Sequence, residues 1–332
     1  IVGPHTPDLA RPISGLKKDA NDNEYPVKIS SALIGSCTNS SYEDIGRAAF
    51  IAREAAKYGL KAKVPLMVTP GSEQTRATIE RDGYLKDLES IGATVLANAC
   101  GPCIGQWKRD DIKEGESNSI VSSFNRNFPA RNDGNAETLS FIGSPESVIG
   151  LALGGTLDFN FLSDTLTTQD GEEILLNPPV ADELPDKGFE ETLEGFIQPT
   201  PGDDVEVIID PESNRLQKLT PFLPPNEEDY VSMSVLMKAE GKCTTDHISP
   251  AGKWLQFRGH LENISQNLFN GVNNAFAEKA GDGVNILTKE VDTLPNIAKN
   301  YSEENVSWVA VGDENYGDCL LYTSPSPRDK RQ

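Results

Sequence analysis

The stretch VKISSALIGSCTNSSYEDIGRAAFIAREAAKYG (residues 27–59) decides the fold. Residues 27–34 alternate and then run apolar into Gly35, which predicts a strand that ends in a tight loop at Cys37. After that loop, the residues SYED open an alanine-rich segment that reaches Gly59, and this predicts a helix with a glycine at its C-terminal stop. The stretch therefore predicts a strand, a cysteine-bearing loop and a helix.

The same strand-and-helix pattern continues along the chain. The predicted strands are residues 64–68, 93–97 and 119–124, and the predicted helices are residues 73–91, interrupted at Gly83, and a segment that begins at Ser144. Alternating strands and helices predict a three-layer α/β/α domain with a mostly parallel sheet. Ligands of such sheets bind beyond the carboxyl ends of the strands, where both cysteine sites fall.

The character of the chain changes near residue 190. Residues 190–230 are rich in proline and acidic side chains, which is typical of a linker. Strand-like runs at residues 231–237 and 306–311 then indicate a second, partial α/β domain. We therefore divide the chain into an α/β domain, a linker, a partial second domain and a tail, at residues 1–189, 190–230, 231–317 and 318–332.

Composition limits the classes of partner. The 332 residues are 37% hydrophobic and 24% charged, which is ordinary for a soluble globular protein. Fifty-one acidic and thirty basic residues give a net charge of -21, so we expect no nucleic-acid partner. The apolar run at residues 148–153 is far shorter than the roughly 20 residues of a membrane span, so we expect no membrane partner.

The cysteine count and the first residues bear on the compartment. Five cysteines, an odd number in a chain of this length, favour a reducing compartment over a secreted disulfide framework. The start at Ile1 has neither a Met nor the apolar core of a signal peptide, so we read it as the middle of a longer chain.

Three cysteines form an incomplete metal-ligand set. Cys100 and Cys103, in the sequence CGPC, can face one centre from a single turn, and Cys37 can add a third thiolate from a neighbouring strand end. Three thiolates on an iron–sulfur cluster would leave one iron open to act as a Lewis acid. Spacing alone also allows plain buried thiols, a redox dithiol, or a zinc site, although no histidine lies near a second cysteine pair.

The segment FNRNFPARND (residues 124–133) places Arg126 and Arg131 in one loop after a strand. Guanidinium forks match carboxylates, and each charge-assisted bond contributes about 1.5–3 kcal/mol, so two of them suit a polycarboxylate. A surface loop with ion pairs to nearby acids is the alternative interpretation. Asn125 could orient a ligand or cap a turn.

The second domain contains the polar segment GKCTTDHISPAG (residues 241–252), followed by Arg258 and His260. Asp246 beside a histidine could tune a proton-transfer group, and Arg258 could bind another carboxylate. The alternative makes Asp246 and the preceding threonine a helix cap and His260 a satisfied polar contact. We interpret Cys243 as a small residue of a polar pocket, because no spacing ties it to the other cysteines.

Taken together, these segments closely resemble the aconitase family, and specifically its mitochondrial type. The resemblance runs from residue 1 to about residue 317 and rests on residues 34–42, 97–107, 122–133, 242–261 and 312–317. The form GKCTTDHIS favours the mitochondrial type over the cytosolic type that doubles as an iron-regulatory protein. Homoaconitase and isopropylmalate dehydratase are more distant relatives with the same cysteine pattern.

The resemblance implies a function for each motif. It implies that Cys37, Cys100 and Cys103 hold a 4Fe-4S cluster, and that the open iron binds the substrate hydroxyl. The implied substrate ligands are the arginines at 126, 131 and 258, with Asp246 in the supporting polar network and Asp246 and Arg258 counted as catalytic. The implied reaction is the isomerisation of citrate to isocitrate through cis-aconitate, in the tricarboxylic acid cycle of the mitochondrial matrix.

The resemblance also implies a partial second domain of the swivel type and a complete protein that is a monomer. The family's catalytic serine lies in a Gly-Ser-Ser-Arg-Glu loop after Gly317, where this chain instead continues with Asp318 and Cys319. We therefore expect residues 318–332 to be foreign to the family and an artefact of the coding sequence, and we expect the chain alone to be inactive. The alternatives are another hydro-lyase of the superfamily, homoaconitase-like, or an RNA-binding regulator in the metal-free form.

Overall fold

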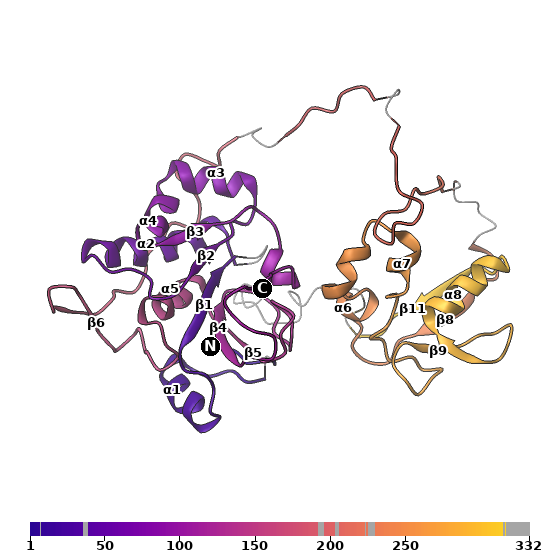
Figure 1. Cartoon of the computed structure of the whole chain (residues 1–332), viewed down its shortest axis with the longest axis horizontal. Coiled ribbons are helices and arrows are strands. Elements are labelled where there is room, and N and C mark those ends of the chain that lie inside the picture. Colours follow the sequence, from indigo (N-terminus) through magenta and orange to yellow (C-terminus); the bar gives the residue numbers. More distant parts are fainter. Residues whose placement is uncertain are drawn as a thin grey trace. The chain divides into compact units, whose positions relative to one another are not determined.

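The computed structural model describes residues 1–6, 8–35, 39–191, 196–202, 206–222, 224, 230–314 and 316. The chain forms two compact units, Ile1–Gln198 and Pro199–Gln332, each with its own apolar core (Figure 1). Among the described residues, no helix has the length and apolar character needed to cross a membrane.

A five-stranded parallel sheet forms the centre of the first unit, in the order β3-β2-β1-β4-β5. The strands are β1 (Ile29–Ile34), β2 (Leu66–Val68), β3 (Ala93–Val95), β4 (Asn118–Ser122) and β5 (Thr138–Ile142). The helices are α1 (Ile13–Asp22), α2 (Tyr42–Lys57), α3 (Glu73–Arg81), α4 (Tyr84–Ser90) and α5 (Pro145–Gly154), and a small hairpin pairs β6 (Leu166–Thr167) with β7 (Glu173–Ile174). The predicted α/β class with a parallel sheet is confirmed, although α1 and β5 were not predicted.

Helix α2 begins where the Cys37 loop ends. Its N-cap is Ser41, whose hydroxyl accepts from the Asp44 N–H while the Asp44 carboxylate accepts from the Ser41 N–H. This capping box satisfies two backbone groups that a helix start leaves open. The helix then buries a row of small side chains, including Ala48 and Ala52, and packs against α4 and α5. The cap thus fixes where the chain leaves the loop.

The two faces of the sheet carry different clusters. Successive strand residues point to opposite faces, so Ile34 of β1 joins the large core that the helices share, whereas Leu33 points the other way. Leu33 belongs to a smaller cluster with Ile120, Cys103 and Phe124. The cysteine turn and the start of the arginine loop therefore lie on the face opposite that core.

The strand order reverses beside β1. The chain passes from β1 to β2 and β3 on one side and then returns to β4 on the other side of β1. In parallel sheets, the crevice beyond the carboxyl ends of the strands at such a reversal is the usual ligand site. Here that position adjoins the loop after β1 and the loop after β4, which contain Cys37 and the two arginines.

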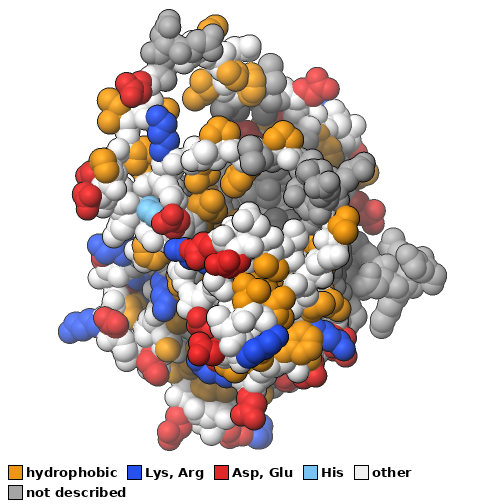
Figure 2. All heavy atoms as spheres, turned by 90° about the vertical axis from the view of Figure 1, so that its right-hand side faces the viewer, with side chains coloured by type: hydrophobic (Ala, Val, Ile, Leu, Met, Phe, Trp, Pro, Cys, Tyr) orange, Lys and Arg blue, Asp and Glu red, His pale blue; other side chains and the backbone are white. Residues whose placement is uncertain are grey.

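The second unit is smaller. It contains a parallel pair of β8 (Ser234–Lys238) and β11 (Trp308–Val311), an antiparallel pair of β9 (Asp282–Val284) and β10 (Val291–Thr293), and α6 (Thr245–Ile248), the 3-10 turn η3 (Gly252–Phe257), α7 (Leu261–Ser265) and α8 (Leu294–Glu303). Its core includes Met237, Leu294 and Tyr301. The face in Figure 2 mixes acidic, basic and apolar side chains.

Candidate functional site

Both ends of the loop that contains Cys37 are bound to Ser123. Gly35 donates its N–H to Oγ of Ser123 at 3.0 Å, and the side-chain amide of Asn39 donates to the Ser123 carbonyl oxygen at 2.6 Å. Cys37 itself lies outside the described residues. The loop is therefore fixed at both ends to the residue that follows β4.

Gly35 allows this loop to approach β2 closely. Its φ is +147°, and a Cβ at this position would lie 2.8 Å from Cβ and 2.9 Å from the carbonyl oxygen of Thr69. The Thr69 N–H donates to the Ile34 carbonyl oxygen at 2.8 Å, so the two strand ends are held against each other. Only glycine has both the conformational freedom and the lack of bulk that this position needs.

Cys100 and Cys103 lie on one tight turn. The 3-10 turn η1 (Gly101–Ile104) follows Cys100, and the Cys103 N–H donates to the Cys100 carbonyl oxygen at 2.7 Å. Cys100 is exposed, whereas Cys103 is 7% exposed. Pro102 preorganises the turn, because its ring fixes φ. One turn thus offers two thiols, as the sequence predicted.

The arginine loop is hydrogen-bonded to that turn. Nε of Arg131 donates to the Cys103 carbonyl oxygen at 2.7 Å, and the side-chain amide of Asn132 donates to the Pro102 carbonyl oxygen at 3.1 Å. The Cys103 thiol lies 3.7 Å from Oδ1 of Asn125. Arg131 is 6% exposed, so it is not the surface side chain of the alternative interpretation. The cysteine turn and the arginine loop therefore form one hydrogen-bonded assembly. Arg126 belongs to the same loop and is half-buried.

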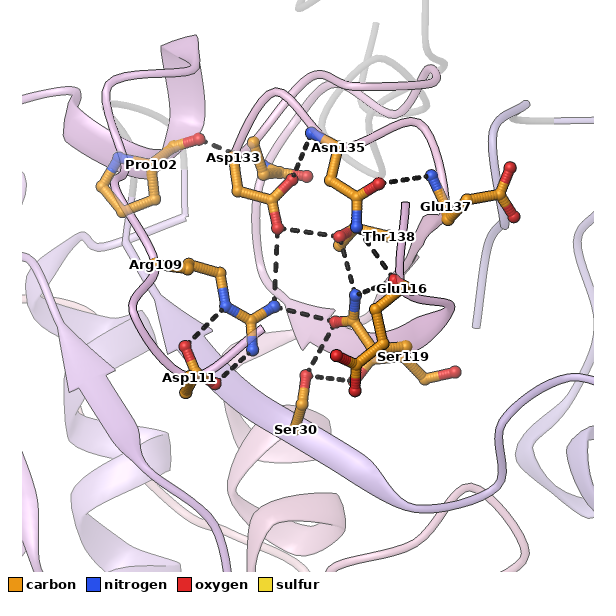
Figure 3. Close-up of polar contacts among 12 residues, drawn as sticks. Ser30, Pro102, Arg109, Asp111, Glu116, Ser119, Asp133, Asn135, Glu137 and Thr138 are labelled. Carbon is orange, nitrogen blue, oxygen red and sulfur yellow. Dashed lines mark hydrogen bonds and ion pairs between the residues drawn. The ribbon is translucent and has the colours of Figure 1, made fainter. Parts of the chain in front are cut away.

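Sequence reasoning missed a polar network beside this assembly (Figure 3). At its centre, the side chain of Arg109 lies between Asp111, Asn118 and Asp133. The signal was hidden because Arg109 is part of the charged run KRDD (residues 108–111), and such runs are usually solvated. The aromatic Trp107 just before the run was the one cue that part of it is buried.

In the second unit, Asp246 lies in the first turn of α6, and the helix cap is Thr244. The Thr244 N–H donates to Nδ1 of His247 at 3.0 Å, so Thr244 and His247 form the capping box of this helix. Cys243 is fully buried in the apolar core beside residues such as Met237, and burial raises the pKa of its thiol. Our interpretation of Cys243 as a residue of a polar pocket is therefore wrong.

Arg258 lies at the end of η3 and is exposed. Residues of the predicted linker pair with Gly259, the residue that follows Arg258. Leu216 forms a parallel bridge with Gly259, and the Gln217 N–H donates to the Gly259 carbonyl oxygen at 2.9 Å. His260 caps α7 by accepting the Asn263 N–H at 3.3 Å, which is the satisfied polar contact of the alternative interpretation.

The predicted site residues thus fall into two groups. The structure places Cys100, Cys103, Arg126 and Arg131 in the first unit, where Arg131 is bonded to the cysteine turn, and it places Asp246 and Arg258 in the second. Their roles stay predictions, as does the division of the chain into four segments. Cys319 and the tail at residues 318–332 lie outside the described residues.

The described residues can be tested against a metal cluster by donor chemistry. Among them, no group of three His, Cys, Asp or Glu side chains is arranged to hold a metal ion. The third predicted ligand, Cys37, lies outside the described residues. Two cysteine thiols on one turn, with two residues between them, have the donor chemistry of iron–sulfur cluster ligands.

The first unit is therefore a parallel α/β domain in which a Cys-x-x-Cys turn is hydrogen-bonded to an arginine-bearing loop. Residues 2–155 match the sequence profile described as "Aconitase family (aconitate hydratase)", and residues 233–319 match the "Aconitase C-terminal domain". The chain belongs to the aconitase family.

Curated relatives agree with this assignment. The "Probable aconitate hydratase, mitochondrial" of Dictyostelium discoideum is 51% identical over 319 residues, which is 96% of this chain and 41% of that protein. The "Aconitate hydratase, mitochondrial" of Saccharomyces cerevisiae is 52% identical over 320 residues, with the same two coverages of 96% and 41%. The protein of that name from Gracilaria gracilis is 51% identical over 320 residues. The chain therefore spans about 41% of the length of these relatives.

Proposed function

We propose that this chain supplies cluster-binding and substrate-binding residues of an aconitate hydratase, which isomerises citrate to isocitrate through cis-aconitate in the tricarboxylic acid cycle. In this proposal Cys37, Cys100 and Cys103 hold a 4Fe-4S cluster. A cluster held by three thiolates supplies an open iron that acts as a Lewis acid on a substrate hydroxyl. The chain's other site residues bind and orient the carboxylates.

The bond from Arg131 Nε to the Cys103 carbonyl oxygen carries the proposal. It holds a guanidinium that is 6% exposed directly against the turn that bears two of the three thiols. Charge-assisted hydrogen bonds to a carboxylate are stronger where water is excluded. A carboxylate bound by Arg131 would therefore be oriented relative to Cys100 and Cys103 by the protein itself.

Charge supports a tricarboxylate as the substrate. The chain carries a net charge of -21, so a trianion needs a local cluster of positive charge to bind at all. Arg126 and Arg131 supply two such charges on one loop. Arg258 and Asp246, in the second unit, are the further predicted carboxylate ligand and supporting polar group. The names of the relatives above support a mitochondrial location.

The test is anaerobic reconstitution of the purified chain with iron and sulfide. We expect a brown protein with sulfur-to-iron charge-transfer absorption, and loss of that absorption in each of the variants Cys37→Ser, Cys100→Ser and Cys103→Ser. The matched control is Cys243→Ala, which should keep the absorption because Cys243 is buried in the core of the second unit and its raised pKa keeps it a thiol.

Two other results would each reject the proposal in a different way. A colourless protein in which only Cys100 and Cys103 titrate as a dithiol would indicate a redox module. Tight binding of a stem-loop RNA by the metal-free chain, measured by filter binding, would instead favour the regulatory alternative.

A further inference from the structure

The charged run at residues 108–111 contains one side chain that turns inward. The side chains of Lys108 and Asp110 are 89% and 86% exposed, as expected for a solvated run. The side chain of Arg109, between them, is 3% exposed. Because burying a charge is costly unless other groups replace its water, the partners of Arg109 show what it holds in place.

Arg109 contacts four neighbours at once, and Figure 3 draws the polar contacts among them. Its Nε and Nη2 donate to the two oxygens of Asp111 at 3.1 and 2.6 Å. Its Nη1 donates to Oδ1 of Asn118 at 2.8 Å and lies 3.5 Å from Oδ2 of Asp133. The guanidinium carbon lies 4.8 Å from the ring centroid of Trp107. A planar fork can make these contacts together, whereas the point charge of a lysine cannot.

Asp133 joins this arginine to the sheet. Its side chain is 2% exposed, and it accepts from Oγ1 of Thr138 at 2.7 Å and from the Asn135 N–H at 3.0 Å. The side-chain amide of Asn118 donates to the same Thr138 oxygen at 2.9 Å. Asn118 begins β4 and Thr138 begins β5, so the network anchors on the amino ends of two paired strands.

The arginine loop is the crossover between those two strands. Since β4 and β5 are parallel, the chain must return from the carboxyl end of β4 to the amino end of β5, and such crossovers are usually helical. Residues 123–137, all of them described, contain no helix, so side-chain bonds must hold the loop. Arg131 and Asn132 bind the cysteine turn, and the next residue, Asp133, binds Arg109.

We propose that Arg109 is a positioning residue for the site. It ties the segment that follows the Cys100–Cys103 turn to the far end of the crossover loop, and so sets where Arg126 and Arg131 lie relative to the two cysteines. The consequence for substrate binding rests on the proposed function, but the mechanical link does not. Arg109 itself touches no substrate or cofactor in this account.

The first test uses the metal-free chain with the variants Arg109→Lys and Asp133→Asn. The rate at which iodoacetamide alkylates Cys103, resolved by peptide mass spectrometry, should rise about tenfold or more in both variants, because a loosened loop releases the turn that keeps Cys103 7% exposed. The second variant keeps the shape of the side chain, so it remains informative if the first does not fold.

The matched control is Arg47→Lys. Arg47 donates from Nε and Nη2 to Oε1 of Glu146 at 3.1 and 2.9 Å, and this pair joins α2 to α5, neither of which belongs to the crossover loop. Its Cys103 alkylation rate should stay within twofold of the parent, even where the melting temperature falls as far as in the Arg109 variant. An unchanged rate in both Arg109→Lys and Asp133→Asn, or an equal rise in the control, would overturn the inference.

The second test measures citrate binding to the iron- and sulfide-loaded chain by calorimetry. We expect Arg109→Lys to raise the Kd for citrate about tenfold or more at equal cluster content, since small misplacements of binding groups are costly, and the control to leave it unchanged. If the two variants are alkylated faster at Cys103 but the parent chain binds no citrate, the proposed function is contradicted and the mechanical link still holds. If the parent chain binds citrate and Arg109→Lys binds it with the same Kd, the link has no role in the site.

Discussion

At the scale of the residue, Arg131 is where the predicted cluster ligands and the predicted substrate ligands meet. Its guanidinium lies 5.1 Å from the ring centroid of Phe128 and donates to the Cys103 carbonyl oxygen. The preceding residue, Ala130, has a φ of +61°, a left-handed conformation that costs a non-glycine residue on the order of 1 kcal/mol. The loop accepts this strain in a position that places Arg131 against the turn.

Replacing Arg131 with lysine tests this arrangement. Arg131→Lys removes the Nε donor and the planar fork, so we expect the Kd for citrate of the loaded chain to rise by about 10- to 100-fold, which corresponds to one charge-assisted bond of roughly 1.5–3 kcal/mol. Calorimetric titration with citrate measures the change.

The control for this substitution is Arg53→Lys. Arg53 pairs with Asp87 at 2.6 Å on a more exposed surface between α2 and α4, so citrate binding should not change. A Kd for Arg131→Lys equal to that of the parent would remove Arg131 from the substrate site.

Single residues also show what sequence could predict. The cysteine pair and the two arginines stand in short, distinctive segments, so their local chemistry could be inferred before the structure. Arg109 could not, because a charged run gives no sign of which member turns inward. Cys243 was misjudged because its polar neighbours in sequence are not its neighbours in space.

At the scale of the element, the predicted strands and helices of the first unit reappear with slightly shorter bounds. Helix α1 was missed because its N-cap is Pro12, which makes no side-chain cap bond, so the usual start signal is absent. Strand β5 was missed because a polar loop precedes it and the signal for α5 at Ser144 follows closely. The pairing of β5 with β4 depends on the crossover, which local patterns do not encode.

The loop after β1 yields a prediction at this scale. In Gly35→Ala the new Cβ would meet the Thr69 backbone and side chain, so we expect the Cys37 loop to shift, with a loss of about 1–3 kcal/mol in unfolding free energy and of iron in the reconstituted chain. Urea unfolding and iron analysis measure the two effects.

A substitution at a second glycine distinguishes the effect of the steric contact with Thr69 from the effect of backbone strain. Gly171 also has a positive φ, of +85°, but a Cβ there would have nothing within 4 Å. Gly171→Ala should therefore lower stability modestly and leave the iron content unchanged. If both variants reconstitute equally well, the Cys37 loop does not depend on its approach to β2.

At the scale of the whole molecule, predicted site residues occur in both units. The cysteines and two arginines belong to the first unit, and Asp246 and Arg258 belong to the second. The linker contributes to the second unit, because Leu216 pairs with Gly259 beside Arg258, where a Cβ on Gly259 would lie 2.8 Å from the leucine side chain. The composition of residues 190–230 predicted a linker but gave no sign of this contact.

The central claim is that three cysteines of this chain hold a cluster with one iron open to a tricarboxylate. The most direct test is the Mössbauer spectrum of the chain reconstituted with ⁵⁷Fe, recorded with and without citrate. The account predicts that the signal of a single iron site changes when citrate is added, while the thiolate-bound irons keep theirs. Spectra that are identical with and without citrate, from a chain that has bound its cluster, would contradict it.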